Sequence, residues 1–270
     1  MARSALSRLR PPLRALVFDV DGTLAQTERD GHRVAFNLAF DELGLGWHWD
    51  VRLYGELLAV AGGKERVLHY WRGVDPQAAA GPAAQQLVAE VHRRKTAHYL
   101  RQVEAGQVRL RGGVARLLRQ ASRAGLALAI ATTTSEANVH ALLQATLGAT
   151  AQGLFACVGA GDCVPRKKPD PGIYLWVLQR LGLAAEECLA FEDSAVGLRA
   201  ACDAGLRTIV TPAEYTLQQD FEGAWAVLDG LGEARARVRG RVAGREWSGV
   251  LGLRQLREWA QAPAQGAAPG

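Results

Sequence analysis

Short, continuous apolar runs alternate with segments of helical periodicity between Arg109 and Val210 of this 270-residue chain. Uninterrupted apolar strands separated by helices are typical of a parallel sheet that is covered by helices on both faces. The pattern therefore predicts an α/β fold with a parallel-sheet core. The expected elements are strands at 126–131, 154–158, 188–191 and 207–210 and helices at 114–124, 137–147, 195–204 and directly after Pro171.

Another predicted strand lies near the N-terminus, in the stretch LVFDVDGTL (residues 16–24), and ends in two carboxylates. Asp19 and Asp21 stand at positions i and i+2, so on an extended chain they point to the same side. Like charges at this spacing repel each other unless a cation lies between them. The pair therefore predicts a positive partner at this strand end.

Residues 29–106 show only helical periodicity and no alternating β-branched run. They predict an all-helical cap domain inserted into the sheet domain. The core domain would then consist of residues 1–28 and 107–232. A C-terminal extension at 233–270 would be partly disordered, with a short docking helix at 251–259 and a disordered Ala/Gly/Pro-rich end. The helices expected around the insertion are 28–43, 51–59, 65–71 and 83–104.

The composition excludes several classes of protein. Apolar residues make up 49% of the chain and charged residues 22%, which is a globular balance. No apolar run approaches the roughly 18 residues of a membrane span, and the four cysteines lack C-x-x-C spacing. The net charge of +5 comes from scattered arginines, which suits an anionic small substrate. We expect a cytoplasmic monomer with no nucleic-acid or membrane partner; in a eukaryote, an organelle stroma is the alternative location. We also expect the Arg-rich N-terminus to be frayed.

Polar residues gather where the predicted strands end. In parallel sheets ligands bind at the carboxyl ends of the strands, so we expect these side chains to converge on one rim. The helical insertion leaves the chain at the same rim and is placed to act as a lid. The clusters, in chain order, are Asp19 with Asp21, Thr132 with Thr133 and Thr134, Lys168 in a loop rich in Pro and Asp, and Glu192 with Asp193.

The carboxylates predict a site for a hard divalent cation. Mg²⁺ prefers oxygen ligands in near-octahedral geometry. Asp19, Asp193, the main-chain carbonyl of Asp21 and Glu192 would supply them. The ion would relieve the repulsion between Asp19 and Asp21 and leave Asp19 ionised.

The same rim predicts phosphoryl transfer. An ionised aspartate is a known nucleophile toward phosphoryl groups, and the catalysis of this reaction depends on cations and N–H donors around the phosphoryl oxygens. We assign the nucleophile to Asp19 and the general acid and base to Asp21. The Thr132 hydroxyl, the amide of Thr133 and the ammonium of Lys168 would hold the phosphate.

Each cluster alone has a simpler explanation. A D-x-D pair is often a solvated turn, the three threonines suit a helix N-cap, Lys168 suits a solvated loop, and Glu192 with Asp193 suits a helix start. All four clusters in this order, each near a strand end, favour a shared site.

Four motifs resemble those of the haloacid dehalogenase superfamily of phosphohydrolases. They are DVDGTL, the strand that ends in Thr132, KKPDP with Lys168, and FEDSAVGL with Glu192 and Asp193, and the resemblance covers residues 14–230. It implies a Rossmann-like core, a helical cap, Mg²⁺ and an aspartyl-phosphate intermediate on Asp19.

Motifs in the cap resemble those of the CbbY-like proteins associated with the Calvin cycle. They are TERDGHR, LYGELL, GGKER and HRRKT, together with ATTTS in the core. This resemblance implies hydrolysis of xylulose-1,5-bisphosphate, a misfire product that inhibits Rubisco. One phosphate of the substrate would then be cleaved at Asp19 and the other held by the cap.

Several cap residues suit that task. Gly62 and Gly63 with Lys64 and Arg66 combine flexible backbone with two cations, which suits a phosphate. A helix start whose basic residues face solvent is the alternative. We also predict that Glu28 binds sugar hydroxyls and that Lys95 is a second anchor; a first-turn helix acid and a solvated helix face are the alternatives.

The sequence predicts a magnesium-dependent sugar bisphosphate phosphatase, with xylulose-1,5-bisphosphate as the leading substrate. A sugar phosphomutase similar to β-phosphoglucomutase shares every core motif, and a phosphatase of other small esters such as phosphoglycolate is a further alternative. A binding module on the same fold is disfavoured because it has no need of both Asp19 and Asp21.

Overall fold

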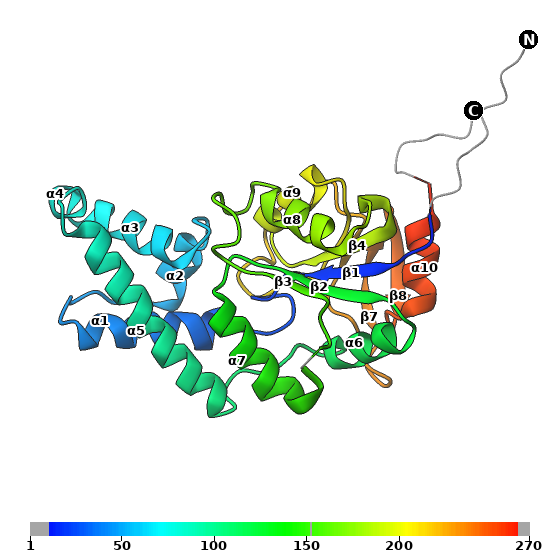
Figure 1. Ribbon diagram of the computed structural model, residues 1–270, viewed down its shortest axis with the longest axis horizontal. Helices are drawn as coiled ribbons and strands as arrows, with labels where there is room; N and C mark the ends of the chain where they lie inside the picture. Colours follow the sequence, from blue (N-terminus) through cyan, green and yellow to red (C-terminus); the bar gives the residue numbers. More distant parts are fainter. Residues whose placement is uncertain (1–10, 152, 264–270) are drawn as a thin grey trace, which may run out of the picture.

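The structure is a computed structural model that describes residues 11–151 and 153–263. One eight-stranded sheet lies at its centre, in the order β3-β2-β1-β4-β5-β6-β7-β8, and a group of helices projects from one end (Figure 1). Strands β1 to β6 are parallel, and β7 and β8 continue the sheet antiparallel. The strands are β1 (Ala15–Phe18), β2 (Ala127–Ala131), β3 (Cys157–Gly159), β4 (Cys188–Glu192), β5 (Arg207–Val210), β6 (Ala226–Leu228), β7 (Val238–Val242) and β8 (Arg245–Gly249).

Helices cover both faces of the sheet. Figure 1 shows α8 and α9 on one side of the sheet and α6 and α7 on the other. Leu16 and Phe18 of β1 pack in the apolar layer that includes α6, α7 and α10, whereas Ala15 and Val17 pack in the layer that includes α8 and α9. Since both faces are buried, the strand is apolar at every position. The α/β class is confirmed, and the elements predicted between Arg109 and Val210 are present with ends displaced by a few residues. The helices are α6 (Val114–Arg123), α7 (Glu136–Leu147), α8 (Gly172–Leu181), α9 (Ala195–Asp203), α10 (Leu253–Gln261) and the 3₁₀ turns η2 (Gly148–Ala151) and η3 (Ala185–Glu187).

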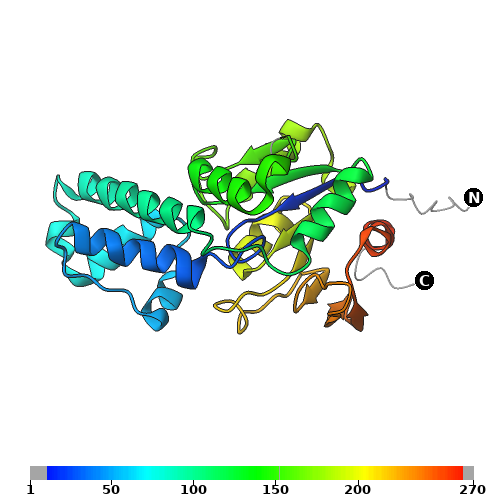
Figure 2. The same cartoon turned by 90° about the horizontal axis from the view of Figure 1, so that it is seen from below.

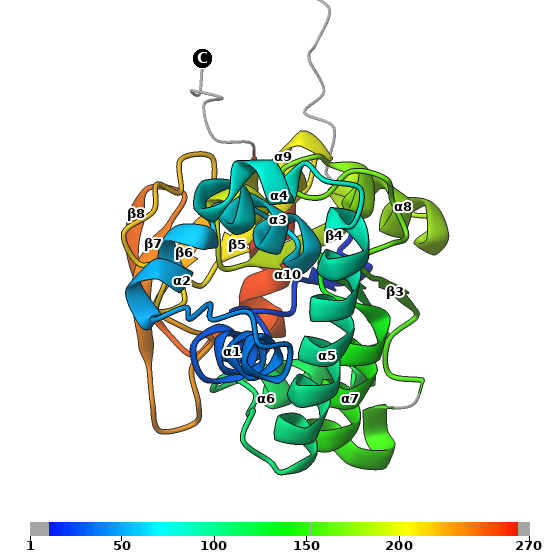
Figure 3. The ribbon, with the colours of Figure 1, turned by 90° about the vertical axis from the view of Figure 1, so that its left-hand side faces the viewer.

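The cap is helical, as predicted (Figure 3), and its core is rich in aromatic residues. Phe36, Phe40 and Trp49 are buried against one another, with ring centroids 4.8 Å apart between Trp49 and each phenylalanine. Asn37 holds the Trp49 backbone by two hydrogen bonds, of 2.9 and 2.8 Å. These contacts fix the loop between α1 and α2. The cap helices are η1 (Glu28–His32), α1 (Arg33–Glu42), α2 (Val51–Leu57), α3 (Gly63–Val74), α4 (Pro76–Ala79) and α5 (Ala84–Glu104).

The entrance to the cap is a π-helical turn. The sequence predicts one helix at 28–43, but the structure begins with η1, in which the His32 amide donates to the Thr27 carbonyl at 2.7 Å. Single π turns widen a helix and are frequent at functional sites. The turn bears on the site because Thr27 and His32 both reach Asp21.

The C-terminal extension continues the sheet. The sequence predicts neither β6 nor the hairpin of β7 and β8, which Figure 2 shows beside α10. The docking helix is present as α10; the Arg207 guanidinium donates to carbonyls of Trp259 and Ala262 at its end. The N-terminus expected to be frayed (1–14) and the end expected to be disordered (260–270) lie outside the described residues at 1–10 and 264–270; within the described part, Leu13 and Ala260 are buried, and Ala260 belongs to α10. The domain boundaries stay a prediction.

The described helices include none that is long and apolar enough to cross a membrane.

Candidate active site

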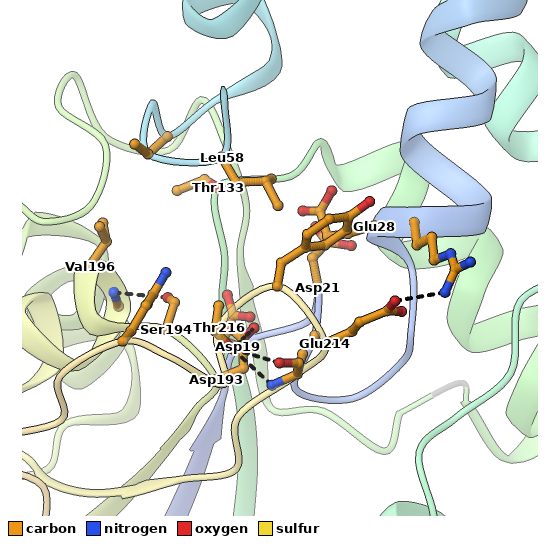
Figure 4. A pocket seen from close by; sticks show the side chains of 18 of the residues that line it. Asp19, Asp21, Glu28, Leu58, Thr133, Asp193, Ser194, Val196, Glu214 and Thr216 are labelled. Carbon is orange, nitrogen blue, oxygen red and sulfur yellow. Dashed lines mark hydrogen bonds and ion pairs between the residues drawn. The ribbon is translucent and has the colours of Figure 1, made fainter. Parts of the chain in front are cut away.

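The strand register brings the predicted clusters together. Phe18 pairs with Ile130 of β2 and with Phe191 of β4, so Asp19, Ala131 and Glu192 stand level at the carboxyl ends of three neighbouring strands. A cleft of about 310 Å³ opens at this rim between core and cap. Its lining includes Asp19, Asp21, Thr133, Lys168 and Asp193 from the core and Glu28, Leu58 and Arg66 from the cap (Figure 4).

Lys168 lies at the centre of the core end of the cleft, the part lined by Asp19, Lys168 and Asp193. Its buried ammonium donates to Asp19 Oδ1 at 2.8 Å, to Glu192 Oε1 at 2.6 Å and to the Ala131 carbonyl at 2.8 Å. Tyr174 donates to the same Glu192 oxygen at 2.5 Å. Burial alone would lower the pKa of Lys168, but Asp19 and Glu192 outweigh it and raise the pKa. The lysine is therefore charged at neutral pH.

The buried carboxylates next to Lys168 fit a divalent cation. Oxygens of Asp19, Glu192 and Asp193 lie within 4.8 Å of one another. Burial raises the pKa of Asp19 to about 7, against the opposing charge of Lys168, and burial also raises the pKa of Asp193. The one positive charge of Lys168 does not balance the negative charges of three carboxylates. A hard divalent cation, which prefers oxygen ligands, would supply the missing positive charge. Glu192 already accepts from Lys168 and Tyr174, which leaves Asp19 and Asp193 freer to ligate.

Gly22 allows this close approach. A Cβ at this position would lie 2.2 Å from Asp193 Oδ2, and its φ of 85° is in the left-handed region that favours glycine. The glycine of DVDGTL is thus required by both the backbone and the facing carboxylate.

Asp21 has different surroundings from Asp19. Its Oδ1 accepts hydrogen bonds from Thr27 at 2.5 Å and from His32 Nε2 at 2.9 Å. Although burial opposes the shift, the positive charge that the His32 and Lys95 pair carries, with the hydrogen bonds of His32 and Thr27, lowers the pKa of Asp21 to about 2. The two carboxylates therefore differ in affinity for protons: without a metal ion Asp19 holds its proton more tightly than Asp21, and a cation beside Asp19 would favour the ionised form that a nucleophile needs.

Lys95 lies behind His32. Its buried ammonium is 2.9 Å from His32 Nδ1, and burial lowers its pKa to about 8, so it remains mostly protonated at neutral pH. An ammonium only donates, so Nδ1 is the acceptor and Nε2 carries the hydrogen that Asp21 accepts. Lys95 does not line the cleft, and its ammonium instead joins a chain to Asp21.

The three threonines have separate surroundings. Thr133 lines the cleft, and the Thr132 hydroxyl is buried and accepts from the Thr134 amide at 3.3 Å. Thr134 accepts from Asn138 of α7 at 3.2 Å. Thr134 thus contacts the helix that Ser135 caps.

At the cap end of the cleft, polar groups are bonded to one another. The Tyr54 hydroxyl donates to Glu28 Oε2 at 2.5 Å and accepts from Arg66 at 3.2 Å. Arg66 also donates to the carbonyls of Leu57 and Val60, both at 3.2 Å. Glu28 and Arg66 are therefore held in fixed positions facing the cleft.

The GGK part of GGKER lies elsewhere. Gly62, Gly63 and Lys64 line a smaller cleft of about 30 Å³ with His92 of the cap and Asp162 of the core. Burial and the charges of Lys95 and Lys64 lower the pKa of His92 to about 4. The structure thus separates Lys64 from Arg66, which the sequence groups together.

Sequence reasoning missed Thr27, His32, Tyr174 and Arg111. Arg111 donates to the carbonyls of Gly22, Thr211 and Pro212, so it joins the loops after β1 and β5. Two of these residues, Thr27 and His32, belong to the TERDGHR motif. Their spacing in the sequence does not predict a contact with Asp21, because the π-helical turn determines where their side chains point.

Comparison with known proteins agrees with this fold. The family model for haloacid dehalogenase-like hydrolases matches residues 13–205. The chain therefore belongs to the haloacid dehalogenase-like hydrolases, and the prediction of an enzyme of this phosphatase type is confirmed.

Within this family the chain groups with the CbbY proteins. It is 52% identical to the CbbY protein of Cupriavidus necator over 90% of this chain and 96% of the relative. A crystal structure of CbbY from Rhodobacter sphaeroides with phosphate has a TM-score of 0.75 and 46% identity. A variant of that protein in complex with xylulose-1,5-bisphosphate has a TM-score of 0.74 and 44% identity. Both alignments cover 81% of this chain and 94% of the other.

Proposed function

We propose that this protein is a magnesium-dependent phosphatase of sugar bisphosphates, with xylulose-1,5-bisphosphate as its substrate. One observation carries the proposal: a single cleft joins the Asp19 and Lys168 group to the fixed guanidinium of Arg66. A guanidinium is suited to a phosphate. The bound xylulose-1,5-bisphosphate of the CbbY relative supports the same assignment.

In the proposed reaction Asp19 attacks the phosphorus, the bond to the sugar oxygen breaks, and an aspartyl phosphate forms. Lys168 and the amide of Thr133 would stabilise the charge on the phosphoryl oxygens. Mg²⁺, held by Asp19, Asp193 and Glu192 with the Asp21 carbonyl, would neutralise further charge there.

Asp21 would transfer the protons. Its Oδ1 is held by Thr27 and His32, so Oδ2 is the oxygen free to face the leaving alcohol and later the attacking water. The low pKa of Asp21 favours its ionised form, which acts as the general base in the second step. For the first step Oδ2 must carry a proton, which we assign to solvent in the cleft, whereas His32 and Lys95 hold Oδ1 in place. In this proposal Lys95 acts through His32 and does not anchor the substrate directly.

A phosphomutase is the second candidate, since a putative β-phosphoglucomutase from Thermotoga maritima has a TM-score of 0.54 and 25% identity. Mutase and phosphatase differ in whether a sugar hydroxyl or water takes the phosphoryl group from Asp19. The test is kcat/KM over a panel of sugar mono- and bisphosphates with Mg²⁺. We expect the highest value, with release of free phosphate, for xylulose-1,5-bisphosphate. Isomerisation of glucose 1-phosphate without phosphate release would contradict the proposal.

A further inference from the structure

The loop that follows β5 reaches from the core to the cap. Glu214 forms a 2.6 Å ion pair with Arg29 at the base of the cap. Tyr215 packs edge-on against Tyr54, with ring centroids 5.9 Å apart. The Thr216 hydroxyl lies 3.4 Å from Asp193 Oδ2. Figure 4 shows Glu214 and Thr216 on this loop beside Asp193, so the loop lies along the cleft between its two ends.

Tyr215 lines this cleft, and its hydroxyl is an unsatisfied polar group. Its oxygen is shielded from solvent, and within residues 11–151 and 153–263 it has no hydrogen-bond partner. A buried hydroxyl without a partner costs about 1–3 kcal/mol, and such groups in native proteins call for an explanation. Burial raises the pKa of Tyr215, so the phenol keeps its hydrogen at neutral pH. It is therefore a spare donor.

The ring of Tyr215 is held in place although its hydroxyl is unused. A Cβ at Gly55 of α2 would lie 2.9 Å from the Tyr215 ring, so the glycine permits the contact. The neighbouring Tyr54 differs, because its hydroxyl already bonds to Glu28 and Arg66. Tyr215 and Glu28 thus line the same cleft as a donor and an acceptor.

We propose that Tyr215 is a specificity-determining residue whose hydroxyl donates a hydrogen bond to an oxygen of the sugar chain of the substrate. A sugar carbon chain carries hydroxyl and carbonyl oxygens, which need donors and acceptors together, and Tyr215 and Glu28 supply one of each. A phosphate ester without these oxygens gains nothing from Tyr215. This inference rests on the proposed function, because it concerns the same cleft and substrate class.

The test is Tyr215→Phe, which removes only the hydroxyl. We expect kcat/KM for xylulose-1,5-bisphosphate to fall about tenfold, mainly through KM, since one neutral hydrogen bond is lost. For p-nitrophenyl phosphate kcat/KM should stay within twofold. The Tm should not fall, because no protein partner loses its bond. Tyr70→Phe is the matched control: Tyr70 packs on Trp47 and Trp49 in the cap and does not line the cleft.

An unchanged kcat/KM for the bisphosphate, or an equal loss on both substrates, would overturn the role of Tyr215. The proposed function fails separately, if the wild-type protein releases no phosphate from xylulose-1,5-bisphosphate. In that event the Kd of the bisphosphate is measured by calorimetry for Asp19→Asn with and without Tyr215→Phe. A tenfold weaker Kd with the second substitution supports the inference, and equal values or no binding overturn it.

Discussion

The two ends of the cleft are built from different chemistry. At the core end, buried charges contact one another directly, with Lys168 between Asp19 and Glu192 at 2.8 and 2.6 Å. At the cap end, Arg66 and Glu28 are joined through the Tyr54 hydroxyl and set among aromatic rings. Charges in a buried site act strongly on a transferring group. Phenols and a fork-shaped guanidinium instead recognise shape and oxygen positions.

This difference indicates a division of labour. On the proposed function, the core residues of the cleft would determine whether a phosphoryl group is transferred, and the cap residues would determine which ester reaches it. Substitutions at the core end should therefore reduce kcat for all substrates, whereas those at the cap end should change KM and depend on the substrate.

The largest effect is expected for Asp19→Asn. Removing the nucleophile should lower kcat by about 10⁴-fold or more on every substrate. The fold should survive, because the substitution removes one of three crowded carboxylates and leaves Lys168 paired with Glu192. Phosphate release and thermal unfolding measure the two effects. Residual activity within tenfold of wild type would contradict the assignment of Asp19.

A smaller effect is expected at the cap. Arg66→Lys keeps the positive charge but loses the planar guanidinium, which can donate two hydrogen bonds to one phosphate. We expect KM for xylulose-1,5-bisphosphate to rise about 10- to 100-fold, because one charge-assisted hydrogen bond is lost. For p-nitrophenyl phosphate KM should change little. Lys64→Ala is the companion variant: it should also raise KM more for the bisphosphate than for the monophosphate, but less than Arg66→Lys, because Lys64 lines the smaller cleft. Equal effects on both substrates would contradict the cap's role.

The smallest effect concerns stability and pH. The pKa of Asp19 is raised from 3.8 to about 7, so between these values the folded state binds more protons than the unfolded state, and stability without Mg²⁺ should fall as pH rises. The expected loss is roughly 2 to 4 kcal/mol. Asp21 acts oppositely: its pKa of about 2 gives stability that is lost only as pH falls from about 4 toward 2.

Urea unfolding between pH 4 and 7.5 measures the decline. Saturating Mg²⁺ should reduce it, because the ion favours charged Asp19, and Asp19→Asn should lessen it; the part that remains comes from Asp193, whose pKa burial also raises. A stability that rises over this range in the absence of Mg²⁺ would contradict the burial argument.

The sequence predicted the core end better than the cap end. Buried parallel strands have a continuous apolar signature, and their carboxyl ends meet by topology, so Asp19, Lys168 and Asp193 could be grouped without coordinates. The grouping of Lys64 with Arg66 did not hold, because α3 begins at Gly63 and directs the two side chains to different clefts.

The network around Asp21 was beyond sequence reasoning. Helical periodicity predicts an ordinary helix at 28–43, and only the π turn brings Thr27 and His32 onto one carboxylate oxygen. The contact between Lys95 and His32 joins residues 63 positions apart, which no local pattern encodes. Strand β6 was missed because it has only three residues, and β7 (VRGRV) and β8 (REWSG) were missed because arginine, glutamate and glycine interrupt any apolar run.

The β7–β8 hairpin also protects the chain against self-association. Without it β6 would be the edge of the sheet and would present unpaired amides and carbonyls to other chains. With it the edge strand is β8, five residues long and charged at Arg245 and Glu246. Charge on a short edge strand discourages strand pairing between molecules. The extension thus acts as a guard against aggregation, on the opposite side of the sheet from the shorter edge strand β3.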